Sequence, residues 1–357
     1  MNSNLSETLQ RFLFAIVLVI SFFIVFTYLL SMGLGILVFF STAEGLKFSQ
    51  DTIPLHPLFI IDVTIPVNVG LYFIFLWWVF ALCFAAAWKY RKSLSRARES
   101  FSSAAKQSPF SNNLLAMPLI TSMLLVATIV LNHLQTQGGI PTGSIPISDP
   151  FLGFLIVSRA PLVEEIIFRI IPIGTFLVTY IFLAGKRTRP DFSWSQRLKT
   201  SILSVLQPEK AKETVDLKTI GKGGLFGGVI WAEWVMVFLT ASLFGIAHYF
   251  GGWEPGKISQ AAMSGAVFAL AYLYYGVQAP ILLHWYFNYY FTVFDLSSSY
   301  YSAEVDFAYF LAVSTNLFLG ILMWIAVMIF SIITIFKVLR RKPKPIPVPE
   351  PPSFASL

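Results

Sequence analysis

The sequence predicts an all-α membrane protein, a polytopic helical bundle with about eight transmembrane helices. Of its 357 residues, 56% are hydrophobic and only 12% are charged, and the mean hydropathy is +0.71. A soluble globular domain carries about a quarter charged residues. The apolar residues also lie in long runs, and a run of about 20 apolar residues is the length needed to cross the hydrocarbon of a bilayer.

Eight apolar runs are predicted to be spans. Segments rich in glycine and proline separate several of them, including Gly138–Pro141 and Gly251–Gly256. The first run is too long for the apolar region of a signal peptide, so we expect it to be retained as a helix. The predicted spans are Phe12–Phe40, Ile65–Trp88, Leu114–Leu134, Phe151–Ala184, Phe226–Phe250, Ile258–Gly276, Pro280–Phe294 and Phe307–Val338.

The basic residues are concentrated in three segments. Residues 89–106 hold six Lys/Arg, residues 186–222 hold nine and the tail from Lys337 holds five, together 20 of the 25 in the chain. The positive-inside rule makes these segments cytoplasmic and, with eight spans, places both termini in the cytoplasm. We therefore expect a multi-pass integral membrane protein in contact with lipid, and no nucleic-acid binding despite the net charge of +7.

The first candidate site lies in the fourth predicted span. Ionisable side chains inside a membrane are costly, which makes each a functional candidate. The adjacent Glu164 and Glu165 point about 100° apart on a helix. Glu165 precedes Arg169 by four residues, the favourable order for an ion pair. Glu164 is then the free carboxylate, able to act as a general base. Alternatively, all three charges form a packing network between helices.

Two of the four histidines also lie in predicted spans. His248 ends the segment Phe244–His248, in which Gly245 is small enough to let another helix or a peptide come close. It is either a hydrogen-bonded core residue or a catalytic one. His284 and Asn288 are four residues apart and share a helix face. They either hydrogen-bond between helices or donate to a developing oxyanion.

Together these segments provide one free carboxylate, two imidazoles and one amide, which is enough to hydrolyse an amide bond with activated water. Glu164, His248 and His284 could instead bind zinc, with water as the fourth ligand. The motif H-E-x-x-H is absent, so the sequence leaves open whether the cofactor is zinc or none. Neither G-x-S-x-G nor a cysteine near a histidine is present to support serine or thiol chemistry.

The three segments, in this order, resemble the CPBP family, which contains the type II CAAX prenyl proteases and the bacteriocin-processing (Abi) intramembrane proteases. The family motifs E-E-x-x-x-R, F-x-x-x-H and H-x-x-x-N correspond to Glu164–Arg169, Phe244–His248 and His284–Asn288. The resemblance covers about residues 158–290. The first three predicted spans and the tail carry no family motif.

The resemblance implies an eight-helix intramembrane endopeptidase, a hydrolase that cleaves a membrane-associated peptide or lipidated protein, either of the prenylated CAAX type or a leader peptide. Both a metalloprotease-like and a metal-free glutamate mechanism are argued for the family, and the sequence decides neither this nor the substrate. The implied roles are water activation by Glu164 and His248, oxyanion binding by His284 and Asn288, and structural support by Glu165, Arg169 and Phe244.

Two other functions remain open from the sequence. The same intramembrane Glu and His groups could relay protons in a proton-coupled transporter, although such proteins favour internal repeats and none is visible here. The chain could also be a non-catalytic membrane scaffold that uses its basic loop and its tail for docking. Glu233 lies in a predicted span without an identifiable partner.

Residues 1–342 are predicted to form one membrane-embedded domain, with a catalytic core at about 151–295. The basic loop 186–222 is its largest soluble piece, and Trp194–Leu206 is predicted to be a short surface helix. Residues 343–357 follow as a disordered, proline-rich tail. A flat count of residues places Glu164 and His284 at different depths, but we expect them to converge because irregular helices are tolerated around a wet cavity.

Overall fold

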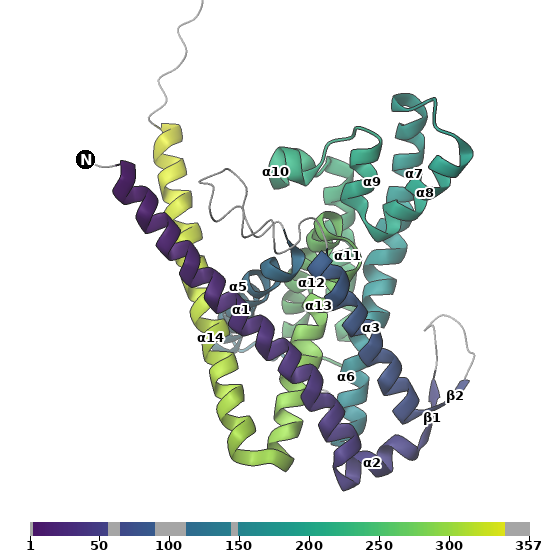
Figure 1. Ribbon diagram of the computed structural model, residues 1–357, viewed down its shortest axis with the longest axis vertical. Helices are drawn as coiled ribbons and strands as arrows, with labels where there is room; N and C mark the ends of the chain where they lie inside the picture. Colours follow the sequence, from purple (N-terminus) through teal and green to yellow (C-terminus); the bar gives the residue numbers. More distant parts are fainter. Residues whose placement is uncertain (1–2, 56–64, 90–111, 144–148, 340–357) are drawn as a thin grey trace, which may run out of the picture.

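The computed structural model describes residues 3–55, 65–89, 112–143 and 149–339, and they form a helical bundle (Figure 1). The predicted tail and most of the first and third basic segments lie outside the described residues. The first half of the bundle consists of α1 (Ser3–Ser41), α2 (Ala43–Gln50), β1 (Thr52–Leu55), β2 (Ile65–Asn68), α3 (Val69–Lys89), α5 (Asn113–Gln137) and α6 (Pro150–Glu165).

The second half of the bundle contains two π-helical turns, η2 and η3, each inserted between two α-helices. Its elements are η2 (Ile166–Ile170), α7 (Ile171–Thr188), α8 (Trp194–Leu206), α9 (Pro208–Thr214), α10 (Ile220–Gly228), α11 (Trp231–Phe250), α12 (Gly256–Tyr275), α13 (Gln278–Trp285), η3 (Tyr286–Tyr290) and α14 (Phe291–Leu339).

The structure confirms a polytopic helical bundle but not the count of eight spans. Among the described residues, six helical segments are long and apolar enough to cross a membrane. The last one, Gln278–Phe336, contains two predicted spans, although its helix is kinked where the backbone of Tyr301 leaves helical geometry. The sixth predicted span corresponds to α12, which is not among the six.

Two further boundaries differ from the prediction. The strands β1 and β2 form an antiparallel hairpin in which Thr52 pairs with Asn68, so β2 occupies the start of the second predicted span. The chain also breaks between α10 and α11, and the fifth span begins at Trp231 instead of Phe226. Four-residue strands are too short to produce a recognisable alternation in the sequence.

The two ends of the bundle carry different elements. The start of α1, the end of α14 and the helices α8, α9 and α10 lie at the upper end in Figure 1, whereas α2 and the β1–β2 hairpin lie at the lower end. The helices of the basic loop are therefore at the same end as the start of α1 and the end of α14. This agrees with the predicted topology, while the assignment of that end to the cytoplasm remains a prediction.

The core around α13 is aromatic and tightly packed. Trp285 is fully buried, stacks on Tyr289 with ring centroids 5.3 Å apart, and meets Phe84 of α3 edge-on at 5.2 Å. On the α1 side, Phe39 stacks on Phe73 of α3 at 4.1 Å. Buried aromatic rings of this size dominate packing energies. They fix α13 between α3 and α6 and so set the position of the residues that α13 carries.

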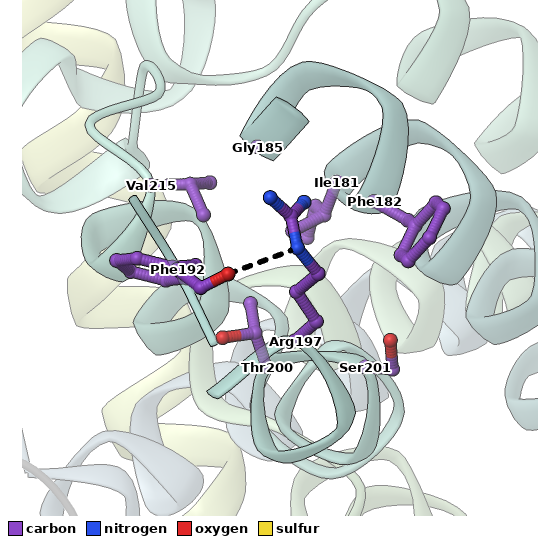
Figure 2. Close-up of a pocket in the computed structure, with 8 residues that line it drawn as sticks. All are labelled: Ile181, Phe182, Gly185, Phe192, Arg197, Thr200, Ser201 and Val215. Carbon is purple, nitrogen blue, oxygen red and sulfur yellow. Dashed lines mark hydrogen bonds between the residues drawn. The ribbon is translucent and has the colours of Figure 1, made fainter. Parts of the chain in front are cut away.

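The predicted surface helix is present with the predicted bounds, and it folds back along α7. Its N-cap is Ser193, which exchanges hydrogen bonds with Gln196 in a capping box. Figure 2 shows the contact between the two helices, with the Arg197 side chain between Ile181 and Val215. The Arg197 guanidinium donates to the carbonyl of Phe192 at 3.2 Å. The basic loop is thus a folded helical unit.

Candidate active site

Two π-helical turns position the residues of the first and third motifs. Glu164 and Glu165 end α6, and Arg169 follows inside η2. His284 lies near the end of α13, and Asn288 follows inside η3. A π-turn locally rewinds the helix and often occurs at functional sites. Because Pro150–Thr188 remains one continuous helical segment, the rewinding turns the side chains without breaking the span.

His284 is the centre of the site. Its Nδ1 is 2.8 Å from Glu165 Oε1, and its Nε2 is 3.7 Å from Glu164 Oε2. The amide Nδ2 of Asn288 approaches the same Nε2 at 3.2 Å. The two adjacent glutamates thus reach opposite nitrogens of one ring, as their angular separation on the helix predicts. The expected convergence of the fourth and seventh predicted spans is observed.

The protons on His284 follow from its partners. A carboxylate only accepts, so the proton of this bond lies on Nδ1, which donates to Glu165. In the neutral ring, Nε2 then accepts from the Asn288 amide. A second proton on Nε2 turns this nitrogen into a donor that faces Glu164. The ring can therefore change between acceptor and donor at the atom nearest the free carboxylate.

Glu165 and Arg169 form the predicted ion pair, and both side chains are fully buried. Arg169 Nη1 donates to Glu165 Oε1 at 3.0 Å, and its guanidinium lies 4.1 Å from the centroid of the Phe244 ring. Gly265 of α12 makes room for this packing, since a Cβ there would lie 2.7 Å from Arg169 Nη2. Glu165 therefore has a second role that the sequence did not reveal, because it also orients His284.

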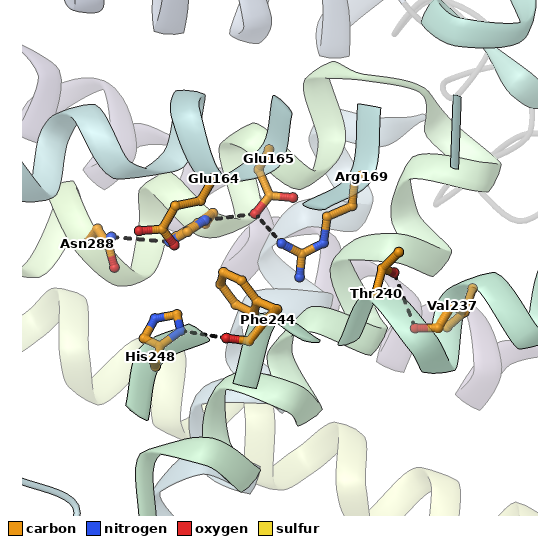
Figure 3. Close-up of polar contacts among 9 residues, drawn as sticks. Glu164, Glu165, Arg169, Val237, Thr240, Phe244, His248 and Asn288 are labelled. Carbon is orange, nitrogen blue, oxygen red and sulfur yellow. Dashed lines mark hydrogen bonds and ion pairs between the residues drawn. The ribbon is translucent and has the colours of Figure 1, made fainter. Parts of the chain in front are cut away.

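His248 lies on the other side of Phe244 (Figure 3). Its Nδ1 pairs with the carbonyl of Phe244 at 2.8 Å, and the two rings meet edge-on with centroids 4.6 Å apart. Gly245, one residue on, permits the close helix contact that the sequence predicts, because a Cβ there would lie 2.4 Å from the carbonyl oxygen of Ile258. The contact to Phe244 leaves Nε2 of His248 as the nitrogen available to a substrate or to water.

A small cavity joins the second and third motifs. It has a volume of about 80 Å³, room for a few water molecules at roughly 30 Å³ each. Residues of α5, α11, α12, α13 and η3 line it. They are Thr128, Phe244, His248, Lys257, Gln260, Ala261, Ser264, Phe268, His284, Phe287 and Asn288.

The proposed metal ligands do not form a metal site in this arrangement. Among the described residues, no group of three or more His, Cys, Asp or Glu side chains is placed to hold a metal ion. Both nitrogens of His284 already face protein partners, Glu165 on one side and Asn288 on the other. Glu164, His248 and His284 therefore do not fit a tetrahedral zinc site as they stand.

Glu233 has a partner that the sequence did not reveal. Lys212 of α9 donates to both carboxylate oxygens of Glu233, at 2.9 and 3.0 Å, and also to the carbonyl of Gly228 at 3.0 Å. Glu233 accepts in addition from the backbone of Ile230 at 2.9 Å, which caps α11. Lys212 lies 21 residues earlier, in the basic loop, where a charged residue would ordinarily be solvated. Glu233 is thus part of a structural ion pair outside the cavity.

Comparison with known proteins agrees with this geometry. Residues 146–290 match the family model described as type II CAAX prenyl endopeptidase, Rce1-like. This segment is similar to that endopeptidase family. The match includes all three motifs and confirms the predicted resemblance to the CPBP family. No curated protein and no solved structure matches the chain.

The Rce1-like match and the six apolar helices together support an integral membrane protein with protease, that is hydrolase, activity. A CAAX protease acts on a peptide or a prenylated protein in a membrane environment. The matched segment covers α6 to η3, which are the elements that bring Glu164, His248 and His284 to the site.

Proposed function

We propose that the protein is an intramembrane endopeptidase that cleaves a peptide bond in a membrane-associated, prenylated peptide of the CAAX type. One observation carries this proposal. Glu164 Oε2 and Asn288 Nδ2 approach the same nitrogen of His284, from helices more than 100 residues apart in the chain. A free acceptor, a histidine that can change its role and an amide donor are the groups that water-mediated amide hydrolysis needs.

Glu164 is the general base. Its side chain is 27% exposed, and its buried Oε2, which lies 3.7 Å from His284 Nε2, has no hydrogen-bond partner among the described residues. It takes a proton from a water molecule, and the resulting hydroxide attacks the carbonyl carbon of the scissile bond. When the tetrahedral intermediate collapses, the C–N bond breaks and Glu164 returns the proton to the leaving amine. The Nε2 of His248 can hold the attacking water.

The oxyanion of the intermediate accepts hydrogen bonds from His284 and Asn288. For this step Nε2 of His284 carries a proton and the Asn288 amide turns from Nε2 toward the substrate oxygen. Glu165 keeps the imidazole ring in place through Nδ1, and Arg169 fixes Glu165. These two residues act through His284 and do not contact the substrate.

The test is cleavage of fluorogenic farnesylated and unprenylated peptides by the purified protein, with and without a metal chelator. We expect Glu164→Gln to lower kcat by about 10²-fold or more, the usual scale of general-base catalysis. The matched control is Glu304→Gln on the exposed surface of α14, which we expect to keep the wild-type rate. A folded Glu164→Gln variant that cleaves at the wild-type rate would refute the mechanism.

A further inference from the structure

Lys257 is a cation in the wall of the active-site cavity that forms no close ion pair among the described residues, although the charge of Glu164 acts on it. It is the second residue of α12, and its side chain is half-buried. Its Nζ lies 4.2 Å from the centroid of the Trp253 ring, a cation–π contact that holds the ammonium group in place. Among the described residues, no carboxylate lies within ion-pair distance of it, and the cavity lining contains neither Asp nor Glu.

The α12 face that carries Lys257 is the face that lines the cavity. Gln260, Ala261, Ser264 and Phe268 follow Lys257 at helical spacing, and all of them line the same space as His248 and His284. Gln260 is fixed by its bonds to Asn132 and Gln135 at 3.1 and 3.0 Å. These bonds to α5 fix the polar wall of the cavity. Lys257 is its first residue along α12.

A desolvated cation is costly unless an anion accompanies it. Any ligand that fills this cavity beside the catalytic groups is therefore favoured if it brings a negative charge. In a peptide substrate, the anion that is present whatever the side chains is the C-terminal carboxylate. We propose that Lys257 binds the C-terminal carboxylate of the peptide substrate, which restricts cleavage to a bond near the end of the chain. This inference rests on the proposed endopeptidase function.

The experiment compares two farnesylated peptides of one sequence, one ending in a free carboxylate and the other in a carboxamide. We expect the wild-type protein in uncharged lipid vesicles to cleave the acid with a kcat/KM about tenfold higher, as for loss of one charged hydrogen bond. In Lys257→Met the two peptides should have kcat/KM values within about twofold of each other, mainly because the KM of the free-acid peptide rises. Lys257→Arg should retain part of the preference.

The control is Lys210→Met on the exposed side of α9, which should keep the wild-type ratio. Equal cleavage of both peptides by the wild type, or an undiminished preference in Lys257→Met, would overturn the inference while leaving the endopeptidase function intact. No cleavage of either peptide by the wild type would instead overturn the proposed function itself. A role of Lys257 in balancing the charge of Glu164 would change both substrates alike and leave the ratio unmoved.

A second, independent observation concerns α8, which exposes three large apolar side chains. Thr200 and Ser204 are buried against α7, whereas Trp194, Leu198 and Ile202 are 74%, 54% and 52% exposed. These three are four residues apart and form a single apolar stripe. In a water-soluble domain, a surface helix buries such a stripe against the core.

The position of α8 identifies the surroundings of this stripe. The helix follows α7 back from Gly185, and the methyl groups of Val205 reach Gly174, within the candidate span Pro150–Thr188. The basic residues Lys186 and Arg187 lie at the turn of this helical pair, where they suit anionic headgroups. We infer that the apolar stripe of α8 is embedded among lipid acyl chains, so that α7 and α8 form a membrane-inserted hairpin.

Spin labels test this inference. Ile202→Cys, in a background with Cys83→Ala, is labelled in vesicles, and its accessibility to oxygen and to a water-soluble nickel complex is measured. We expect the pattern of a lipid-facing site, with high accessibility to oxygen and low accessibility to the nickel complex, as at Leu183→Cys on α7. The label at Lys210→Cys should show the aqueous pattern. An aqueous pattern at residue 202 would overturn the inference, and so would protection from both probes, which would indicate a protein partner.

Discussion

Two buried ion pairs of the described residues, Lys212 with Glu233 and Arg169 with Glu165, differ in how completely the polar atoms around them are paired. In the α9–α11 cluster, Lys212 and Glu233 satisfy each other and the surrounding backbone. In the α6–α13 cluster, Glu164 Oε2, Glu165 Oε2 and Arg169 Nη2 have no hydrogen-bond partner among the described residues. Buried polar atoms without partners are costly and are usually retained for a function.

This difference separates a structural ion pair from a reactive one. The pair between Lys212 and Glu233 links the basic loop to the start of a transmembrane helix, and it leaves no atom free for a ligand. The network around His284 keeps one carboxylate oxygen free beside a nitrogen that can change its role. The sequence alone shows Glu164, Glu165 and Glu233 as carboxylates in predicted spans, and only the pairing in the structure distinguishes their roles.

The largest expected effect is on the structural pair. Lys212→Met leaves Glu233 buried without its cation, which we expect to lower the apparent free energy of unfolding by about 3–5 kcal/mol. Peptide cleavage by the folded fraction should stay within about twofold of wild type, as this cluster is outside the cavity. Thermal unfolding in detergent and cleavage below the transition are the measurements. Lys210→Met is the control, and a comparable loss in that variant would remove the contrast.

The next effect is on the reactive cluster, where we expect the cleavage rate to fall and the stability to stay nearly unchanged. Asn288→Ala removes one oxyanion donor, which we expect to lower kcat by about 10²-fold. The thermal midpoint should change little, because the side chain of Asn288 contacts His284 at the edge of a cavity. Single-turnover cleavage together with thermal unfolding decides the point. A lower midpoint with an unchanged kcat would assign Asn288 to structure.

The smallest effect concerns the packing around Arg169 in the reactive cluster. Gly265→Ala places a Cβ 2.7 Å from Arg169 Nη2 and 3.0 Å from the Phe244 ring. Overpacking of this kind costs about 1–3 kcal/mol. We also expect reduced cleavage, since Arg169 holds Glu165. The matched control is Gly33→Ala in α1, where a new Cβ meets nothing within 4 Å and helix propensity should slightly stabilise the protein.

The sequence was sufficient for features that depend on local spacing. The ion pair of Glu165 with Arg169 and the shared face of His284 and Asn288 follow from helical spacing, and the bounds of α8 are also as predicted. The sequence did not reveal features that depend on distant contacts or on irregular backbone. Neither the partner of Glu233 nor the two π-turns leave a local pattern, because each is decided by packing between elements.

The spans illustrate the same limit. The last helical segment consists of two helices that meet at a kink at Tyr301, so it counts as one where the sequence predicts two, and α12 combines a polar cavity face with its apolar faces. Both features make the number of spans counted from hydropathy differ from the number in the structure. Lys257 was likewise left out of the predicted site because it precedes the apolar run, although α12 brings it to the cavity wall.

The close approach of α11 and α12 has a consequence for the path of the substrate. Gly245 and Gly265 let the two helices meet with no space for a single added carbon atom. A peptide or prenyl chain is far wider than that, so the seam between these helices is a wall and not a lateral gate. The passage into the cavity therefore lies along the rest of its lining, which includes Thr128 of α5 and Phe287 of η3.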